Sequence, residues 1–196
     1  MIPKLYGNPF SRAVRPLWYA EEVGLDLELI KERPQSDLVR TLSPLGQIPV
    51  LQDGDLILRD SIVILNYLAD KTGQLTFAAG SPDRLELDSR LAFLVTDLEA
   101  PLWLWYRRSV ATGDLDTAHD LKVQMRDDYA RGEKRLLRLM GGSAYLMGDG
   151  FTIADIVAGH IGGWASKVGF EPETTQFAEY IERVTNRPAL AAARAR

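Results

Sequence analysis

Short apolar runs alternate with helix-length amphipathic stretches over the first 73 residues. Four runs of strand length stand at residues 2–6, 27–31, 49–51 and 56–58. Helical spacing predicts three helices, from Phe10 to Val23, from Ser36 to a stop at Pro44, and from Asp60 to Gly73. Two strand-helix-strand units favour parallel pairing, and Asp53-Gly54 between the last two runs favours an antiparallel hairpin. We therefore expect a mixed four-strand sheet with three helices.

The chain changes character after residue 73. Residues 74–83 are small and polar and predict a linker, and everything after them has a helical period. One leucine stripe runs from residue 87 to 102 and a second apolar stripe from 121 to 139, with a turn expected at Gly113-Asp114 and a bend at Pro101. The predicted fold class is α/β plus all-α, with one domain over residues 1–73 and an all-helical domain over 84–196.

The helix expected after residue 151 carries a capping motif at its start. Thr152 stands at the N-cap and Asp155 three residues later, with Asp in place of the usual Glu or Gln. This helix is apolar on several sides, which predicts that it forms the buried centre of the second domain. A last helix is expected from about Glu173 to Asn186, and the residues from Ala189 form an Ala/Arg-rich tail.

Composition excludes several kinds of chemistry. The 196 residues contain no cysteine and two histidines, so disulfides, thiolate metal sites and a protein-thiol nucleophile are impossible and no metal site is expected. A net charge of -4, with no basic half, argues against nucleic acid as a partner. The longest uncharged apolar stretch, residues 100–106, is far short of the roughly 20 residues that span a membrane. Because residues 1–4 also lack a signal-peptide layout, we expect a cytoplasmic protein with no membrane partner.

Four places offer candidate chemistry, and each has an ordinary structural alternative. A proline opens a strand at Ile48-Pro49, which suits either an edge strand or a ligand-facing turn. Asp60-Ser61 and the segment 8–12 each stand at a helix start, where main-chain N–H groups attract anions but where a plain cap is also common. The aromatic cluster from Trp103 to Tyr106, followed by Arg107, is suited to core packing or to binding.

Paired carboxylates occur elsewhere in the chain. We interpret Asp127-Asp128 and Glu21-Glu22 as solvated residues on charged helix faces, because they lie within amphipathic helical stretches. No standard phosphate-binding, dinucleotide-binding, metalloprotease or nucleophile-elbow motif is present in the sequence.

Taken in this order and at these separations, the motifs resemble those of the glutathione transferase family over nearly the whole chain. The likeness is to its bacterial-type, cysteine-free members with serine or asparagine at the activating position. The residues that carry it are Ser11-Arg12-Ala13-Val14-Arg15, Leu45-Gly46-Gln47-Ile48-Pro49-Val50-Leu51, Asp60-Ser61 and Phe151-Thr152-Ile153-Ala154-Asp155.

The resemblance implies a thioredoxin-like glutathione-binding domain followed by a helical bundle, with glutathione as co-substrate. Pro49 matches the family's cis-proline, which turns the main chain of Ile48 toward the cysteinyl part of glutathione. Asp60 and Ser61 match the acidic-serine pair that holds the γ-glutamyl end, and Gln47 falls near the glycyl end. The resemblance assigns Thr152 and Asp155 to folding.

The thiol activator is the position at which the sequence departs from the family pattern. The family places Tyr, Ser or Cys near the start of the first helix, but Tyr6 is one residue early for the tyrosine branch. In the serine branch the hydroxyl precedes a Pro-x-x-Arg turn, which here puts Asn8 in that place, and Ser11 lies three residues further on. Either Asn8 or Ser11 is therefore a candidate catalytic residue.

The implied activity is transfer of glutathione to a small electrophile, an activity typical of detoxification enzymes. We expect the electrophile near Phe10, Trp103, Tyr106 and Arg107. The alternatives are a protein that binds glutathione or apolar ligands without turnover, and a scaffold that uses the fold for interaction only. Because relatives commonly pair across the domain boundary, the resemblance also implies a homodimer.

Overall fold

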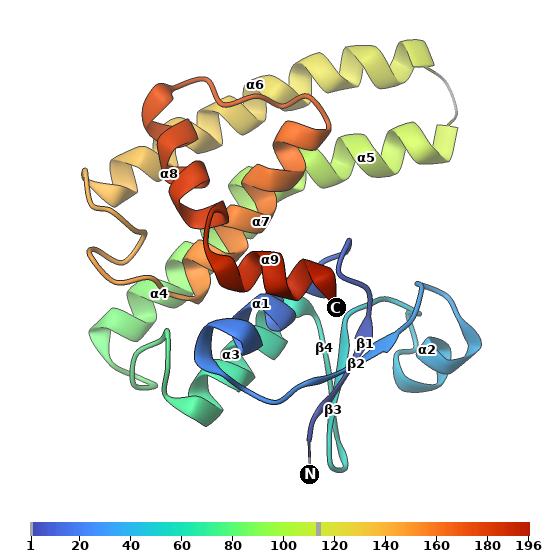
Figure 1. Cartoon of the computed structure of the whole chain (residues 1–196). Coiled ribbons are helices and arrows are strands. Elements are labelled where there is room, and N and C mark those ends of the chain that lie inside the picture. Colours follow the sequence, from blue (N-terminus) through green and yellow to red (C-terminus); the bar gives the residue numbers. More distant parts are fainter. Residues whose placement is uncertain (1, 113–114) are drawn as a thin grey trace. The chain divides into compact units, whose positions relative to one another are not determined.

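The structure is a computed structural model that describes residues 2–112 and 115–196, with the side chains of 110–118 left undescribed. The chain forms two compact units (Figure 1). The first comprises Met1–Ser81 with Asn186–Arg196, and the second Pro82–Thr185. The turn predicted at Gly113-Asp114 lies outside the described residues.

The first unit is built on a four-stranded sheet in the order β2-β1-β3-β4. Its strands are β1 (Lys4–Gly7), β2 (Glu28–Lys31), β3 (Val50–Asp53) and β4 (Leu56–Arg59). The β1 strand pairs in parallel with β2 and antiparallel with β3, and β3 pairs antiparallel with β4. This is the mixed sheet that the apolar runs predicted, and its topology is that of a thioredoxin-like domain.

Helices cover both faces of this sheet. They are α1 (Val14–Val23), α2 (Asp37–Leu42) and α3 (Ser61–Thr72), with α1 and α3 on one face and α2 on the other (Figure 1). The centre of the unit lies between the sheet and these two helices, where Leu5, Leu17, Trp18 and Leu65 are fully buried. The α1 helix begins four residues later than predicted, because residues 9–13 form turns before it.

A short helix returns to the first unit from the other end of the chain. Residues described above as an Ala/Arg tail form α9 (Pro188–Ala195), in which Pro188 occupies the first helical turn, a position that needs no N–H group. The α9 helix packs along α1 and buries Leu190 and Ala193. Residues 186–196 thus belong to the first unit, whereas the sequence assigned them to the helical domain.

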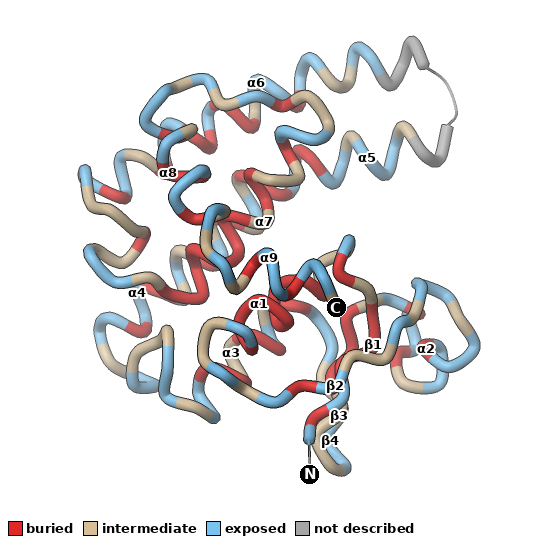
Figure 2. The backbone as a smooth tube through the Cα atoms, in the orientation of Figure 1, coloured by how far each residue is buried: buried red, intermediate tan, exposed pale blue. Residues whose placement is uncertain are grey.

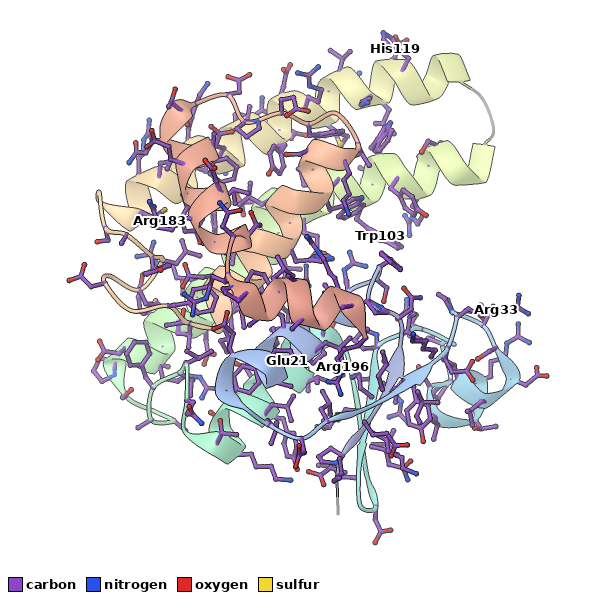
Figure 3. All side chains as sticks on the ribbon, viewed as in Figure 1. Glu21, Arg33, Trp103, His119, Arg183 and Arg196 are labelled. Carbon is purple, nitrogen blue, oxygen red and sulfur yellow. The ribbon has the colours of Figure 1, made fainter. Side chains whose placement is uncertain are left out.

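Two ion pairs hold α9 in place. Glu22 accepts one bond from Trp18 Nε1 at 2.8 Å and a bidentate pair from Arg187 Nε and Nη2, both at 2.6 Å. The Glu22 side chain is only 7% exposed, so its interpretation as a solvated residue is wrong. Arg196 lies beside Glu21 and donates to the Leu27 carbonyl (Figure 3).

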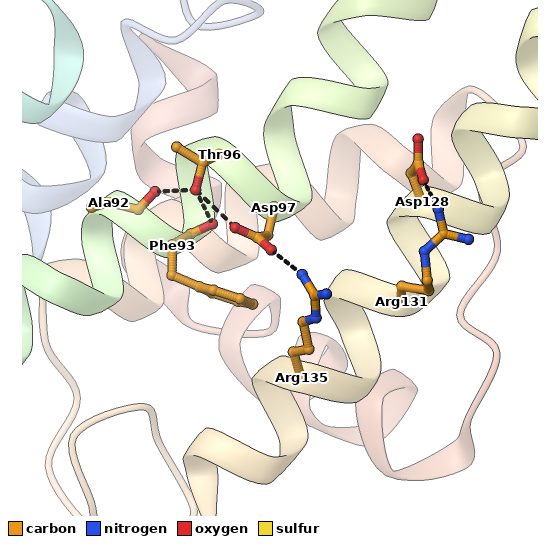
Figure 4. A network of polar contacts seen from close by, with 7 residues as sticks. All are labelled: Ala92, Phe93, Thr96, Asp97, Asp128, Arg131 and Arg135. Carbon is orange, nitrogen blue, oxygen red and sulfur yellow. Dashed lines mark hydrogen bonds and ion pairs between the residues drawn. The ribbon is translucent and has the colours of Figure 1, made fainter.

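The second unit is helical. It contains α4 (Pro82–Phe93), a π-helical segment η1 (Leu94–Glu99), α5 (Ala100–Thr112), α6 (Leu115–Met140), α7 (Ile153–Lys167) and α8 (Thr175–Thr185). The π-helical turn directly precedes Pro101, which cannot donate to the carbonyl four residues before it, and a wider turn accommodates this loss. Asp97 of η1 is tied to α6 by Arg135, and Thr96 donates to the Asp97 carboxylate (Figure 4).

The α7 helix forms the buried centre of the second unit, as its apolar pattern predicted. Residues 152–159 are all buried (Figure 2). The predicted capping box at Thr152 and Asp155 is present, with each side chain bonded to the other residue's main chain. Within the described ranges, no helix is long and apolar enough to cross a membrane.

Candidate functional site

The register of the sheet gathers three of the predicted segments at one end. Tyr6 is opposite Val50 across β1 and β3, and Val50 is opposite Arg59 across β3 and β4. Val50 is the first residue of β3, Arg59 the last of β4, and Gly7, the last residue of β1, follows Tyr6 directly. The ends of β1 and β4 and the start of β3 therefore meet at the peptide bond between Ile48 and Pro49, which is cis.

Gly7 is required at this junction because its neighbours approach too closely for a side chain. A Cβ atom on Gly7 would lie 2.7 Å from the Cβ of Ala13 and 3.8 Å from that of Ile48. The end of β1, the turn before α1 and the loop before β3 are thereby in direct contact. Asn8 follows Gly7 directly at this junction.

The loop that leads to Pro49 is fixed by Gln35. The main-chain N–H of Gln35 donates to the Gly46 carbonyl at 2.8 Å, and its side-chain amide donates to the Leu45 carbonyl at 2.8 Å. Gly46 has a φ of 62°, and a Cβ there would lie 2.5 Å from Gln35 Oε1. Gln47 follows with its side chain exposed, Ile48 is half-buried and Pro49 is buried.

The N-terminus of α3 carries the acidic-serine pair. Asp60 is exposed, and its Oδ1 accepts bonds from the main-chain N–H groups of Ile62 at 2.7 Å and Val63 at 3.4 Å. Ser61 is buried, and its Oγ accepts a bond from Arg15 Nη1 at 3.0 Å. Asp60 thus caps α3 while staying open to solvent, and Ser61 connects α3 to α1.

The two activator candidates lie in the turn before α1 and use their polar groups differently. The Ser11 hydroxyl donates to the Asn8 carbonyl at 2.9 Å and accepts from the Ala13 N–H at 3.2 Å. Asn8 Oδ1 accepts from the Phe10 N–H at 3.0 Å, and its side-chain amide makes only a long contact of 3.5 Å with the Glu32 carbonyl. The Ser11 proton is therefore engaged within the turn, whereas the amide N–H groups of Asn8 are weakly held.

Tyr6 is engaged away from this turn. Its side chain is buried, and its hydroxyl donates to Gln52 Oε1 on β3 at 2.9 Å. The Tyr6 hydroxyl is therefore bonded to β3 and not to the turn before α1.

The residues predicted to contact the electrophile belong to both units. Phe10 of the first unit is 86% exposed. Trp103 and Tyr106 of α5 stack with ring centroids 6.0 Å apart, and Tyr106 meets Trp164 of α7 edge-on at 5.9 Å. Trp103 and Tyr106 remain partly exposed, and Arg107 beside them is exposed. This aromatic face of the second unit is therefore only partly used in packing.

A metal centre has no support in the described part of the chain. No cluster of three or more histidine, aspartate or glutamate side chains is placed there to hold a metal ion. The polar groups of the predicted site residues are instead main-chain amides, the Asp60 carboxylate, the hydroxyls of Ser11 and Ser61, and the carboxamides of Asn8 and Gln47. Such a set is suited to an extended, zwitterionic peptide.

Comparisons with known proteins agree with this geometry. The family model described as glutathione S-transferase, N-terminal domain, matches residues 2–70. A glutathione S-transferase of Hyoscyamus muticus is 30% identical over 172 residues, which cover 78% of this chain and 77% of that protein. One of Triticum aestivum is 29% identical over 158 residues, covering 79% and 74%.

Solved structures share the fold over the full length. A glutathione S-transferase from Xylella fastidiosa superposes with a TM-score of 0.86 at 23% identity, covering 97% of this chain and 96% of that one. A sphingomonad glutathione S-transferase complexed with glutathione gives 0.82 at 26% identity, covering 98% and 97%. The chain belongs to the glutathione S-transferase family. It is thus a member of an enzyme family whose relatives bind glutathione.

Two residues at the site carry roles that the sequence did not indicate. Gln35 holds the loop before Pro49, and Arg15 contacts Ser61. Arg15 was named from the sequence only as part of a segment that resembles the family, and no role was assigned to it. Both contacts join residues far apart in the chain, and no local spacing predicts them. One signal for Arg15 was available in the sequence. An arginine between the apolar residues Val14 and Leu17 stands on the buried side of α1 and therefore needs a polar partner inside the protein.

Proposed function

We propose that this chain binds glutathione at the end of its sheet and activates the thiol for attack on a small electrophile. The observation that supports the proposal is the cis Ile48-Pro49 bond directly before Val50, which pairs with Tyr6 of β1 and Arg59 of β4. The ladder of β3 begins at Val50, so the main chain of Ile48 lies outside it. An extended peptide can therefore add there in the manner of a further strand.

The two ends of the tripeptide would bind through opposite charges. The exposed Asp60 carboxylate suits the ammonium group of the γ-glutamyl residue, and Ser61 at the start of α3 suits its carboxylate. Gln47 is exposed beside Ile48 and would meet the glycyl end. With the Ile48 main chain pairing to the cysteinyl part, the sulfur would lie toward the turn at Asn8.

We assign the donation to the sulfur to Asn8 rather than to Ser11. The Ser11 proton already has an acceptor at 2.9 Å, whereas the Asn8 amide is held only by a 3.5 Å contact. A charge-assisted hydrogen bond contributes roughly 1.5 to 3 kcal/mol, and about 1.36 kcal/mol corresponds to one pKa unit. A single donor therefore lowers a thiol pKa from about 8.5 to about 7. This is enough to ionise much of the glutathione at neutral pH.

The ultraviolet absorbance of the thiolate, measured on the glutathione complex against pH, tests this assignment. We expect a midpoint more than one unit below that of free glutathione. Asn8→Ala should return the midpoint toward about 8.5, and Asn8→Asp should raise it further because a second anion opposes ionisation. Ser11→Ala is the matched variant in the same turn and should move the midpoint less than Asn8→Ala. The reverse order would assign activation to Ser11.

A glutathione-binding protein without turnover remains the second candidate. The observation that favours it is the carboxamide at the activating place, since an amide donates more weakly than a hydroxyl. Tight binding of glutathione with an unshifted thiol midpoint would establish this alternative. Failure to bind glutathione at millimolar concentration, measured by calorimetry, would contradict both.

The electrophile would contact the exposed aromatic residues Trp103 and Tyr106 of the second unit. Aromatic faces stack on planar, electron-poor rings, and Arg107 can stabilise negative charge that develops on the electrophile. Trp103→Ala should raise the KM for a chloronitrobenzene substrate while leaving the KM for glutathione unchanged. Equal changes in both constants would contradict a role on the electrophile side.

We further propose that the chain is a cytoplasmic homodimer. The support is the family resemblance together with exposed leucines on the second unit, Leu85 and Leu104. Light scattering after size exclusion would give a mass of about twice 21.9 kDa for a dimer and 21.9 kDa for a monomer.

A further inference from the structure

A buried arginine lies directly beneath the start of α3. Arg15 is 1% exposed, and its Nη1 donates to Ser61 Oγ, itself in a residue that is 2% exposed. The guanidinium stays protonated at every accessible pH, so this is a permanent positive charge inside the fold. Burying such a charge is costly, and an apolar residue of similar volume would pack there without that cost.

The direction of this hydrogen bond determines what Ser61 can do. Arginine has donors and no acceptor, so the Ser61 oxygen must be the acceptor. Its own proton is then directed elsewhere, and within the described residues it meets no acceptor. Ser61 is the first residue of α3, where the carbonyl four residues back belongs to β4, so the usual bond to the preceding helical turn is absent. The hydroxyl is thus held as a donor.

We propose that Arg15 is a positioning residue that fixes the Ser61 hydroxyl as a donor to the γ-glutamyl carboxylate of glutathione. The inference rests on the proposed function, because it presumes that this carboxylate binds at Ser61. Donation from a cation into the Ser61 oxygen also polarises its O–H bond and strengthens the bond it donates. The charge of Arg15 adds to the positive end of the α3 dipole at the same place. Arg15 therefore acts on the ligand through Ser61, without touching it.

The test pairs variants with two ligands. The first ligand is glutathione, and the second is γ-aminobutyryl-cysteinyl-glycine, in which hydrogen replaces the γ-glutamyl carboxylate and the amine is kept. Loss of the carboxylate also changes the surroundings of the amine. For each ligand, the dissociation constant of a variant is therefore compared with that of the wild type. Arg15→Gln and Ser61→Ala should each weaken glutathione binding about tenfold and weaken analogue binding less than about threefold.

Kinetics provides the second readout. Arg15→Gln should raise the KM for glutathione about tenfold with kcat within about twofold, since the carboxylate is bound equally in the ground and transition states. Arg15→Lys keeps the charge but loses the planar fork, and it should fall between Gln and the wild type. The double variant Arg15→Gln/Ser61→Ala should be no weaker than the weaker single variant, because both remove the same interaction.

Arg84→Gln is the matched control. Arg84 is also buried, at 8% exposure, and pairs with Asp88 on α4. The Arg84→Gln variant should lower the free energy of unfolding without changing the KM for glutathione. The role of Arg15 would be overturned if Arg15→Gln lost affinity equally for both ligands. It would also be overturned if Arg15→Gln kept its affinity for glutathione while Ser61→Ala lost it. Neither result would contradict the proposed glutathione site. If Ser61→Ala also binds glutathione normally, the proposed site itself is wrong.

Discussion

Two helices of this protein begin with an acidic residue and a hydroxyl, and they use them in opposite ways. At α7, Asp155 is fully buried and Thr152 is 5% exposed. At α3, Asp60 is exposed and Ser61 is buried. The two starts have the same chemical groups, so the difference lies in where each group's hydrogen bonds go.

Every acceptor of Asp155 is used inside the protein. Its Oδ1 accepts from the Leu146 N–H at 2.9 Å and the Tyr180 hydroxyl at 2.8 Å, and its Oδ2 accepts from the N–H and hydroxyl of Thr152. Burial raises the pKa of Asp155, and these four donated bonds oppose that effect. The α7 start is therefore a closed set of groups that leaves nothing for a ligand.

The start of α3 is an open set. Asp60 uses Oδ1 to cap the helix, and no bond to its Oδ2 occurs in the described part of the chain. Its φ of 73° is unusual for a residue other than glycine. An exposed carboxylate in an unfavourable conformation, beside a hydroxyl whose proton has no acceptor in the described residues, supports the proposal that a ligand binds here. Of the two capping motifs, the one proposed as a binding site is the one whose hydrogen bonds are left incomplete.

The largest effect should follow removal of the closed set. Asp155→Ala strands two main-chain and two hydroxyl donors, and at about 1–3 kcal/mol for each buried group the loss should reach at least about 3 kcal/mol. Urea unfolding followed by circular dichroism measures it. Tyr180→Phe, which removes a single donor to a charged group, should cost about 1.5–3 kcal/mol and remains measurable if the first variant does not fold. A loss below about 1 kcal/mol for Asp155→Ala would contradict the comparison.

A change to Asp60 at the start of α3 should alter glutathione binding and leave the free energy of unfolding nearly unchanged. Asp60→Asn preserves the cap, because asparagine caps helices as well as aspartate and tolerates positive φ, so unfolding should change by less than about 0.5 kcal/mol. Loss of the charge should raise the KM for glutathione about tenfold. Steady-state kinetics and urea unfolding of the same preparation separate the two. If Asp60→Asn lost stability but kept its KM for glutathione, Asp60 would have a structural role like that of Asp155.

The smallest effect is expected at the other end of α3. Lys71 and Tyr67 both donate to Asp53 Oδ2, and the bond from Lys71 is the main cause that lowers the pKa of Asp53. Lys71 is half-exposed, so Lys71→Met should cost less than about 1 kcal/mol at pH 7.

The pH dependence follows from the sign of that shift. An aspartate whose folded pKa is lowered contributes stability above its ordinary value of about 3.9 and loses it as the pH falls through the lowered value. The gap between the wild type and Lys71→Met should therefore be widest near neutral pH and close below about pH 4. If the stability difference between the two proteins widened in acid, the Lys71–Asp53 ion pair would not be its cause.

Much of the fold follows from local patterns. The four apolar runs, the Asp53-Gly54 hairpin and the capping box at Thr152 are each set by residues within a few positions of one another, and the structure contains all of them. The α9 helix was missed because the residues from Ala189 were interpreted as an Ala/Arg-rich tail, whereas Pro188 starts a helix that packs on α1. Glu22 was misinterpreted for a similar reason, since its partner Arg187 stands 165 residues away.

The candidate site divides along the same line. Pro49, Asp60 and Ser61 are visible as strand and helix starts, and the sheet register then pairs Val50, the residue after Pro49, with Arg59, the residue before Asp60. The contacts of Arg15 with Ser61 and of Gln35 with Gly46 depend on the completed fold, since they join α1 to α3 and one loop to another. A sequence pattern locates the ends of elements, but the pairing of those ends depends on tertiary packing.

The path of α9 gives the two units an interlocked connectivity. The chain leaves the first unit after residue 81 and comes back to it at residue 186, so two covalent connections join the units. A protease that nicks the loop at residues 74–81 would therefore leave both fragments associated through α9 and α1. Residues 1–81 expressed without the final helix would expose the surface of α1 on which α9 packs.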